Sequence, residues 1–307
     1  MIEISNLTKK LNKKIVINDF SLSAQRQECL GLFGSEGPTK TTLLKILTGS
    51  TSPSSGQVNI LGFDTRTHAR QASQAVGYQP AEFSHPSMSV SNLLDFIATL
   101  RGFSGAEKRK RVDRVVMQLE LSSLLGHPIS TLAPGLKRKV AIAQAILHDP
   151  AVLLLDEPCE GLASHQQGKI RALIQSLTEE MTVIIASRDC ESLADTCTRG
   201  LVIGDGCLLA DSPMPELLRS SRHFQAVTLA SESALDLLAL AVLPGVAGIE
   251  EDRLRPGTVT VLAMPGHSIL PAVSALIANR HWQVHSLKME PGRLSDVVHH
   301  LSHEAPL

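Results

Sequence analysis

The chain has 307 residues, of which 43% are hydrophobic and 19% charged, and its formal net charge is −1. This length predicts two domains of an ordinary globular protein. A charge so close to zero gives no general attraction to nucleic acid or to an anionic membrane, and we expect no nucleic-acid partner. Five cysteines at scattered spacings indicate a reducing compartment and no metal cluster. The N-terminus lacks the apolar run of a signal peptide, and the longest apolar stretch, 237–249, is too short and broken to span a membrane.

The first predicted elements are two β-strands, over residues 2–7 and 14–24. Residues 28–42, ECLGLFGSEGPTKTT, then join an apolar strand to a glycine turn and a helical pattern. A strand, Gly, four loop residues, a small residue and Lys-Thr form the pattern of a phosphate-binding P-loop. Loop amides and the helix N-terminus would face phosphate, Lys40 would supply a point charge, and Thr41 could hold Mg²⁺.

This P-loop departs from its pattern at three positions. Thr39 replaces a glycine and adds a Cβ where the backbone must approach phosphate closely. Pro38 removes one N–H donor, and Glu36 places a negative charge beside a polyanion. By the loop alone, a phosphate site and a plain strand–turn–helix unit both remain open. The candidate ATP-binding residues are Gly34, Ser35, Glu36, Gly37, Pro38, Thr39, Lys40, Thr41 and Thr42.

The middle of the chain is predicted to be helical between residues 89 and 149, after short strands near 57–62 and 73–78. The basic run KRKR at 108–111 is interpreted as a solvated helix face, because the chain has almost no net charge.

A continuous apolar run at 151–155, AVLLL, predicts a strand that is buried on both faces of a parallel sheet. It ends in Asp156 and Glu157, at the sheet edge where parallel α/β proteins bind ligands. Asp156 could orient Mg²⁺ through water and Glu157 could polarise an attacking water, or both acids could cap the following helix.

Residues 1–213 together resemble the nucleotide-binding subunit of an ATP-binding cassette (ABC) transporter. The segments that carry the resemblance keep the family's order and spacing: MIEISNLTKK (1–10), KTTLLKILTG (40–49), SSGQVNILG (54–62), LAPGLKRKVAIAQAILHDP (132–150) and LLLDEPCEGLAS (153–164). The stretch VGYQP to SVSNLLDFIATLRG (76–102) and the C-terminal extension are most similar to subunits of ABC-2 type exporters, including the gliding-motility and copper-maturation subunits.

The resemblance also shows which family positions have changed. Leu11 stands where the family has an aromatic residue that stacks on adenine, and Ala81 stands where it has a glutamine that senses Mg²⁺ and γ-phosphate. Three further positions differ: Ala133 replaces the signature Ser, Ala163 replaces the dimer-loop Asp, and Arg188 replaces the switch His. Arginine does not lose its proton in the physiological range, so Arg188 could pair with phosphate but could not titrate as His does.

The family's roles fall on the following positions of this chain. Glu157 would be catalytic with Arg188 in place of the switch His, Thr41 and Asp156 would hold Mg²⁺, and the signature segment Leu132, Ala133, Pro134, Gly135 and Leu136 would face a partner's nucleotide. The cofactor would be Mg²⁺ with ATP, and hydrolysis by this chain is expected to be weak or absent. The expected partners are a multi-span membrane permease and a second nucleotide-binding subunit, identical or different, on the cytoplasmic side of the cell membrane. Because the altered positions would recur at both sites of a homodimer, they favour a heteromeric pair.

Two other functions are also compatible with parts of the sequence. A pseudo-ATPase scaffold that binds no nucleotide is supported by Glu36, Pro38 and Thr39. A soluble ABC protein of translation or DNA repair is less consistent with the sequence, because such proteins usually carry two cassettes or a long coiled-coil insert.

The expected fold class is α/β: an ABC-type P-loop NTPase domain at 1–213, with a mixed sheet and a helical subdomain at about 88–149. A polar linker is expected at 214–223. Residues 224–307 alternate as β-α-β-β-α-β and then a last helix, which predicts a small ferredoxin-like α+β domain. This domain shows no Gly-rich loop or acid pair, and both a regulatory or dimer-forming role and passive packing remain open for it.

Overall fold

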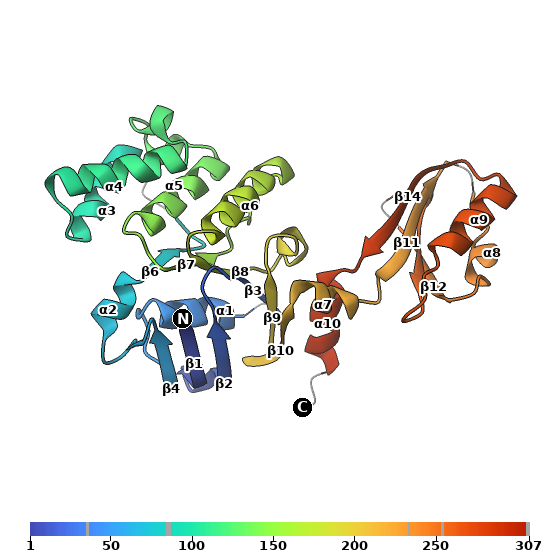
Figure 1. Cartoon of the computed structure of the whole chain (residues 1–307), viewed down its shortest axis with the longest axis horizontal. Helices are drawn as coiled ribbons and strands as arrows, with labels where there is room; N and C mark the ends of the chain where they lie inside the picture. The colour runs from blue at the N-terminus through green and yellow to red at the C-terminus, as the bar shows by residue number, and fades with distance from the viewer. Residues whose placement is uncertain (35–36, 84–86, 233, 253–254, 305–307) are drawn as a thin grey trace. The chain divides into compact units, whose positions relative to one another are not determined.

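The computed structural model describes residues 1–34, 37–83, 87–232, 234–252 and 255–304. Its contacts divide the chain into two compact units (Figure 1). The first unit contains Met1–Asp211 with Glu304, and the second contains Ser212–His303.

The first unit contains two sheets. A four-stranded antiparallel sheet has the order β2-β1-β4-β5, and a six-stranded sheet has the order β10-β9-β3-β8-β7-β6. The strands are β1 (Ile2–Leu11), β2 (Lys14–Ala24), β3 (Cys29–Gly34), β4 (Ser55–Ile60), β5 (Phe63–Asp64), β6 (Val76–Gln79), β7 (Val152–Asp156), β8 (Thr182–Ala186), β9 (Arg199–Gly204) and β10 (Cys207–Pro213). The first strand is four residues longer than the sequence predicts, and β5 was not expected.

The described residues of this unit also form six α-helices. They are α1 (Thr39–Leu47), α2 (Ala69–Gln74), α3 (Val90–Leu100), α4 (Gly105–Gln118), α5 (Pro134–Ile146) and α6 (Ser164–Thr178), with short 3₁₀ turns at Ser122–Leu124, Ile129–Thr131 and Glu191–Leu193. Helices α3, α4 and α5 lie together, away from the strands of the four-stranded sheet (Figure 1). They occupy the stretch that the sequence predicts to be a helical subdomain.

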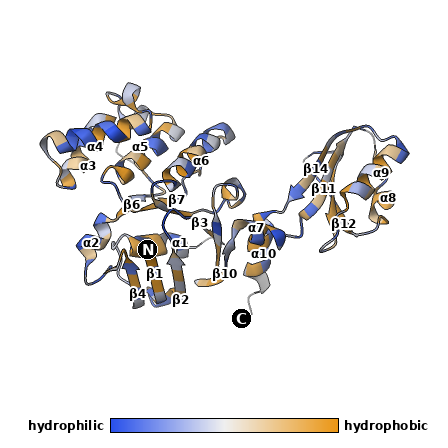
Figure 2. Ribbon diagram, viewed as in Figure 1, coloured by the Kyte–Doolittle hydropathy of each residue, from blue (hydrophilic) through white to orange (hydrophobic). Residues whose placement is uncertain are grey.

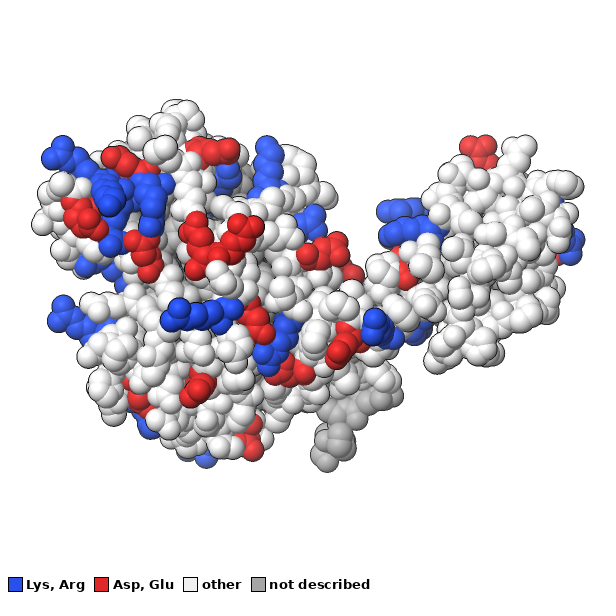
Figure 3. All heavy atoms as spheres, viewed as in Figure 1, with Lys and Arg blue, Asp and Glu red and all other residues white. Residues whose placement is uncertain are grey.

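The basic run of α4 forms ion pairs with acidic neighbours. Lys108 lies 2.6 Å from Asp95, and Arg111 lies 2.6 Å from Glu107 and 2.5 Å from Asp149. Figure 2 shows α4 as largely hydrophilic, and Figure 3 shows Lys and Arg interspersed with Asp and Glu on the visible face. This arrangement is that of a solvated helix face.

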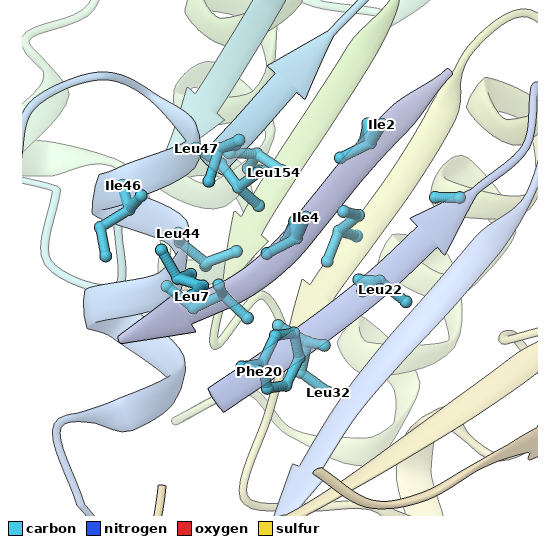
Figure 4. Close-up of a cluster of buried hydrophobic side chains, with 14 of the residues drawn as sticks. Ile2, Ile4, Leu7, Phe20, Leu22, Leu32, Leu44, Ile46, Leu47 and Leu154 are labelled. Carbon is cyan, nitrogen blue, oxygen red and sulfur yellow. The ribbon is translucent and has the colours of Figure 1, made fainter. Parts of the chain in front are cut away.

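The core of the first unit lies where α1 packs between the two sheets. Leu44, Ile46 and Leu47 of α1 meet Leu7 of β1 and Leu154 of β7 (Figure 4). All five side chains are at most 1% exposed, so they contribute hydrophobic stabilisation that fixes the helix after the P-loop against both sheets.

Parallel pairing brings three strand ends to one edge of the six-stranded sheet. β8 lies between β3 and β7, and its Ala186 pairs with Leu32 on one side and with Asp156 on the other. The residues after these three strands begin the P-loop, the segment at Ser187–Arg188 and the segment at Glu157. The sheet therefore gathers at one edge three segments that are far apart in the sequence.

The second unit is built on a four-stranded antiparallel sheet of order β12-β13-β11-β14. Its elements are α7 (Met214–Arg219), β11 (Phe224–Ser231), α8 (Leu237–Ala241), β12 (Val246–Glu251), β13 (Thr258–Ala263), α9 (Leu270–Arg280), β14 (Val284–Pro291) and α10 (Leu294–Glu304). In the order of these strands along the chain, the sheet runs 2-3-1-4, which is the ferredoxin-like order in reverse. The β-α-β-β-α-β alternation of the sequence predicts this unit.

A short helix lies where the sequence predicts a linker. Helix α7 begins after Pro213 and has Pro215 within its first turn, a position where proline favours a helix. Met214 and Leu217 are 3% and 4% exposed, so this segment packs into the protein instead of lying in solvent.

We expect Gly34→Ala to destabilise the protein by about 2 kcal/mol or more. Gly34 ends β3 with φ +147°, and a Cβ there would lie 2.0 Å from the carbonyl oxygen of Ile203 on β9. Urea unfolding followed by circular dichroism measures the change. Gly126→Ala is the matched control, because a Cβ at Gly126 would meet none of the described atoms within 4 Å. Equal stabilities of the two variants would contradict the prediction.

Candidate functional site

A pocket of about 600 Å³ lies in the second unit, and a different one, of about 460 Å³, lies at the strand ends of the first unit. The pocket of the first unit contains most of the residues to which the sequence assigns chemistry. Its lining consists of Gly37, Lys40, Thr41, Ala81, Glu82, Asp156, Glu157, Glu160 and Arg188.

The P-loop leads directly into α1. Pro38 is the N-cap of this helix, and Thr39 donates its hydroxyl to the carbonyl of Val16 at 2.9 Å. The hydroxyl of Thr39 is thus hydrogen-bonded within the fold. Pro38 and Thr39 also line a neighbouring hollow of about 210 Å³. Of the other predicted ATP-binding residues, Thr42 is buried, and its backbone N–H donates to the carbonyl of Pro38. Ser35 and Glu36 lie outside the described residues.

Lys40 places a cation at the base of the pocket with little access to water. Its side chain is 5% exposed, and its Nζ donates to the carbonyl of Gly34 at 2.9 Å. Burial lowers the pKa of Lys40, and the nearby carboxylate of Glu157 partly opposes this shift. An anionic phosphate in the pocket would stabilise this buried charge.

Thr41 and Asp156 form the predicted metal pair. The hydroxyl of Thr41 donates to Oδ2 of Asp156 at 3.0 Å, and the Tyr78 hydroxyl lies 3.3 Å from the same oxygen. Burial raises the pKa of Asp156 despite these two hydrogen bonds, and it also raises the pKa of Tyr78 to about 12. A hydroxyl and a carboxylate are the oxygen donors that Mg²⁺ prefers, and a divalent cation would relieve the unfavourable burial of the carboxylate. These residues therefore fit Mg²⁺.

Glu157 is held by the segment after β8. Its carboxylate accepts the backbone N–H of Arg188 at 3.0 Å and the Ser187 hydroxyl at 3.2 Å. The Arg188 guanidinium lies 3.3 Å from Oε1 of Glu157 and also pairs with Glu160. Arg188 thus reaches the position next to the predicted catalytic carboxylate, but it is engaged there by two acids.

The pocket lining carries more negative than positive charge. Glu82, Asp156, Glu157 and Glu160 contribute four carboxylates, whereas Lys40 and Arg188 contribute two cations. With all groups ionised, the lining has a net charge of −2. A triphosphate alone would be repelled, so a divalent cation is needed to make the electrostatics of binding favourable.

The signature segment begins α5, outside the lining of this pocket. Leu132 is buried, Ala133 is the exposed N-cap, and Pro134 begins the helix, followed by Gly135 and Leu136. No side chain hydrogen bond caps this helix, since alanine lacks the oxygen that a serine would offer. Further along α5, Arg138 donates to the carbonyl of Ala81 at 3.1 Å and so links the signature helix to the loop after β6.

Sequence reasoning missed two acids of the pocket, Glu82 and Glu160. Glu82 directly follows Ala81, where the family's glutamine is missing, and that adjacency was the available signal.

Gln79 is fully buried, and its amide nitrogen points to backbone carbonyls, so it does not line this pocket. Ile15, 44% exposed, lines the 210 Å³ hollow, whereas Leu11 at the predicted adenine position does not.

Comparison with known proteins decides the family. Residues 17–160 match the family model described as ABC transporter. The chain is 31% identical over 222 residues to the Nod factor export ATP-binding protein I of Burkholderia lata, covering 71% of this chain and 73% of the relative. The chain belongs to the ABC transporter family. Within it, the chain is an ATP-binding subunit.

Other relatives of this ABC protein carry similar names. The linearmycin resistance ATP-binding protein LnrL of Bacillus subtilis is 28% identical, with 68% of each chain covered. The probable multidrug ABC transporter ATP-binding protein YbhF of Escherichia coli is 28% identical over 73% of this chain, which spans only 39% of YbhF.

Solved structures confirm the predicted fold class. The cbiO1 protein of Clostridium perfringens, part of the ABC transporter complex cbiONQ, matches 71% of this chain and 90% of its own with a TM-score of 0.64 at 25% identity. The dimeric bacterial cassette MJ0796 matches with a TM-score of 0.62 at 24% identity, which shows the shared fold.

We expect Asp156→Asn to stabilise the nucleotide-free protein near neutral pH while weakening binding of Mg²⁺ with ATP. The pKa of Asp156 is raised in the folded state, so its contribution to stability is present at low pH and is lost as pH rises through the folded pKa. Asparagine keeps the shape and removes this loss.

Chemical denaturation of wild type and Asp156→Asn between pH 4 and pH 8 measures the effect. The advantage of the variant should grow as pH rises. A constant difference across this range would show that the Asp156 carboxylate is not penalised by burial.

Proposed function

We propose that this ABC subunit binds ATP with Mg²⁺, hydrolyses it slowly, and energises a membrane exporter together with other subunits. The observation that carries the proposal is the convergence of Lys40, Thr41, Asp156 and Glu157 on one pocket, with Arg188 paired to Glu157. The exporter role is further supported by the names of the relatives, which include a Nod factor export ATP-binding protein and a linearmycin resistance ATP-binding protein.

Nucleotide binding is assigned to the P-loop and the end of β7. Lys40 would contact phosphate, and the N–H groups at the start of α1 would add donors that have no partner within the helix. Thr41 and Asp156 would hold Mg²⁺ directly or through water, and the ion would supply the positive charge that offsets both the triphosphate and the acidic lining.

Slow hydrolysis follows from how Glu157 is engaged. The carboxylate of Glu157 accepts a backbone N–H and a hydroxyl and forms an ion pair with Arg188, and these contacts compete with the hydrogen bond that it would accept from an attacking water. Arg188 cannot supply or accept a proton as histidine can. The loss of a single transition-state donor can cost on the order of 10²-fold in rate, so the changes at Arg188, Ala81 and Ala133 together predict a weak ATPase.

The partner nucleotide-binding subunit is proposed to be a different chain. In a sandwich dimer, each nucleotide would be shared by one P-loop and the other chain's signature segment. Ala133 and Pro134 are exposed at the start of α5 and would offer no hydroxyl to that nucleotide. A heterodimer with an intact partner would retain one good signature opposite this P-loop, whereas a homodimer would retain none.

The membrane contact is assigned to the helical subdomain and the loop before it. None of the helices in the described part of the chain has both the length and the apolar character to cross a bilayer. Phe96, Leu100 and Met117 are 49%, 66% and 76% exposed on α3 and α4, two helices that contact each other. We assign this surface to a permease, with the subunit on the cytoplasmic face of the membrane.

A non-catalytic scaffold is the second candidate function. It is favoured by the net negative pocket lining and by Pro38 and Thr39 in the P-loop. Such a subunit would keep the cassette shape and its contacts with other subunits but would not bind nucleotide.

Nucleotide binding by the purified chain separates these two functions. We expect saturable binding of labelled ATP in the presence of Mg²⁺ and a loss of at least tenfold in affinity for Lys40→Ala, because the buried cation is removed. Equilibrium dialysis with and without Mg²⁺ measures it, and binding should weaken strongly without the metal. Lys45→Ala, on the same helix but outside the pocket lining, is the matched control.

No binding up to millimolar ATP, both alone and with the co-expressed permease, would favour the scaffold. Binding that is unchanged in Lys40→Ala would place the nucleotide elsewhere.

Restoring the family's residues should increase ATP turnover. We expect Ala133→Ser with Arg188→His to raise turnover at least tenfold, because the pair restores a signature hydroxyl and releases Glu157 from the guanidinium. Release of phosphate at saturating ATP gives the rate. Either single variant should show a smaller gain, and Glu157→Gln should abolish the gain of the double variant. A wild-type homodimer that already hydrolyses ATP efficiently would overturn the prediction and the heteromeric assignment.

A further inference from the structure

The 600 Å³ pocket of the C-terminal unit shares no lining residue with the 460 Å³ pocket of the first unit. It has a volume of about 600 Å³ and lies among the segment after α7, the adjoining ends of β12 and β13, and helix α10. This volume falls in the range of about 300–1,000 Å³ that is typical of small-molecule sites.

The floor of this pocket comes from the sheet face opposite the core of the unit. Val261 faces helices α8 and α9 in the core, so its neighbour Leu262 points to the other face. Leu262, Phe224 and Ala247 line the pocket with Met264, which is 46% exposed. The floor is thus an apolar surface that helices α8 and α9 leave uncovered.

A buried polar network fixes the pocket's other side. His223 is 1% exposed, and its ring nitrogens lie 2.5 Å from Asp296 on α10 and 2.8 Å from Glu250 on β12. Ser221 donates to Asp296 at 2.7 Å and accepts the backbone N–H of Arg293 at 2.9 Å. These contacts tie α10 to β12 and to the start of β11, so the pocket is formed before any ligand arrives, which lowers the cost of binding.

Two arginines, Arg219 and Arg222, are among the described residues that line the pocket. Arg222 forms an ion pair with Glu250 at 2.7 Å, and Asp296 is hydrogen-bonded to the ring of His223. Burial raises the pKa of Asp296, but the hydrogen bonds from His223 and Ser221 outweigh burial and lower it, so this carboxylate stays ionised and satisfied. Among the described residues, no acid forms an ion pair with Arg219, which lines the pocket at the end of α7.

We propose that this pocket binds a small amphipathic carboxylate, with its apolar part on Phe224 and Leu262 and its carboxylate on Arg219. An arginine guanidinium matches a carboxylate through two parallel N–H donors, and the apolar floor contributes hydrophobic stabilisation. A ligand site on this unit would let a small molecule act on the subunit through a place separate from its nucleotide.

Decanoate and decanol form a matched pair of probes, since they share one alkyl chain and differ in the charged head. We expect saturable binding of decanoate to the full chain at one site, with decanol weaker. Arg219→Gln should weaken decanoate roughly tenfold and leave decanol unchanged, because only the carboxylate uses the guanidinium. Isothermal titration calorimetry measures all of these affinities.

Two further variants complete the test. Arg280→Gln, on α9 and outside the pocket lining, should bind decanoate as wild type does. Ala247→Trp should abolish binding of both probes by filling the pocket, and Ala247→Leu replaces it if the larger side chain prevents folding, as judged by circular dichroism.

Binding without saturation, equal loss of decanoate and decanol in Arg219→Gln, or unchanged binding in the filled variant would overturn the proposal. The affinity for ATP with Mg²⁺ should be unchanged in Arg219→Gln. The outcome is therefore independent of whether the phosphate site binds nucleotide.

Discussion

The parallel pairing of β8 with both β3 and β7 is the constraint on which the site depends. Ala186 is at the same level as Leu32 and Asp156, so the segments that follow these strands leave the sheet at one edge. Lys40, Arg188 and Glu157 come from three different segments and meet there because of this register. A slip of one residue in either pairing would turn alternate side chains to the opposite face and separate them.

Burial disfavours the charged forms of Lys40 and Asp156 at this edge. Lys40 and Asp156 are 5% and 3% exposed, and burial lowers the pKa of Lys40 and raises the pKa of Asp156, which favours the neutral form of each. The nearby hydroxyls and opposite charges offset only part of that cost. Phosphate and Mg²⁺ would each supply the missing counter-charge, so the features that strain the nucleotide-free site are those that would favour its ligand. Arg188 already supplies a counter-charge to Glu157, so a cationic ligand would stabilise the Glu157 carboxylate less than it would stabilise Asp156.

The sequence predicted those parts of the structure that depend on local pattern. Lys40 and Thr41 follow from P-loop spacing, Asp156 and Glu157 from the end of an apolar strand, and the C-terminal sheet from alternating strands and helices. The place of Glu82 and Glu160 in the pocket, and the ion pairs of Arg188, could not be predicted from the sequence, because they depend on where three loops meet in space. Helix α7 was expected to be a linker, because Pro215 signals a break from the preceding strand as readily as it signals the first turn of a new helix.

Two of the positions at which the sequence is expected to depart from the family pattern share a structural role. Ala133 and Ala163 are the N-caps of α5 and α6, and neither offers a side-chain oxygen to its own helix. Alanine at an N-cap is about 0.5–2 kcal/mol less stabilising than serine or aspartate, and in the proposed dimer it would also offer no oxygen to a partner. Local features offset part of the cost: Pro134 presets the first turn of α5, and the side chain of Gln166 accepts the N–H of Ala163 at 3.3 Å. The cassette thus forms both helix starts without a side-chain oxygen at either N-cap, so folding does not require the oxygens that the proposed shared nucleotide site would use.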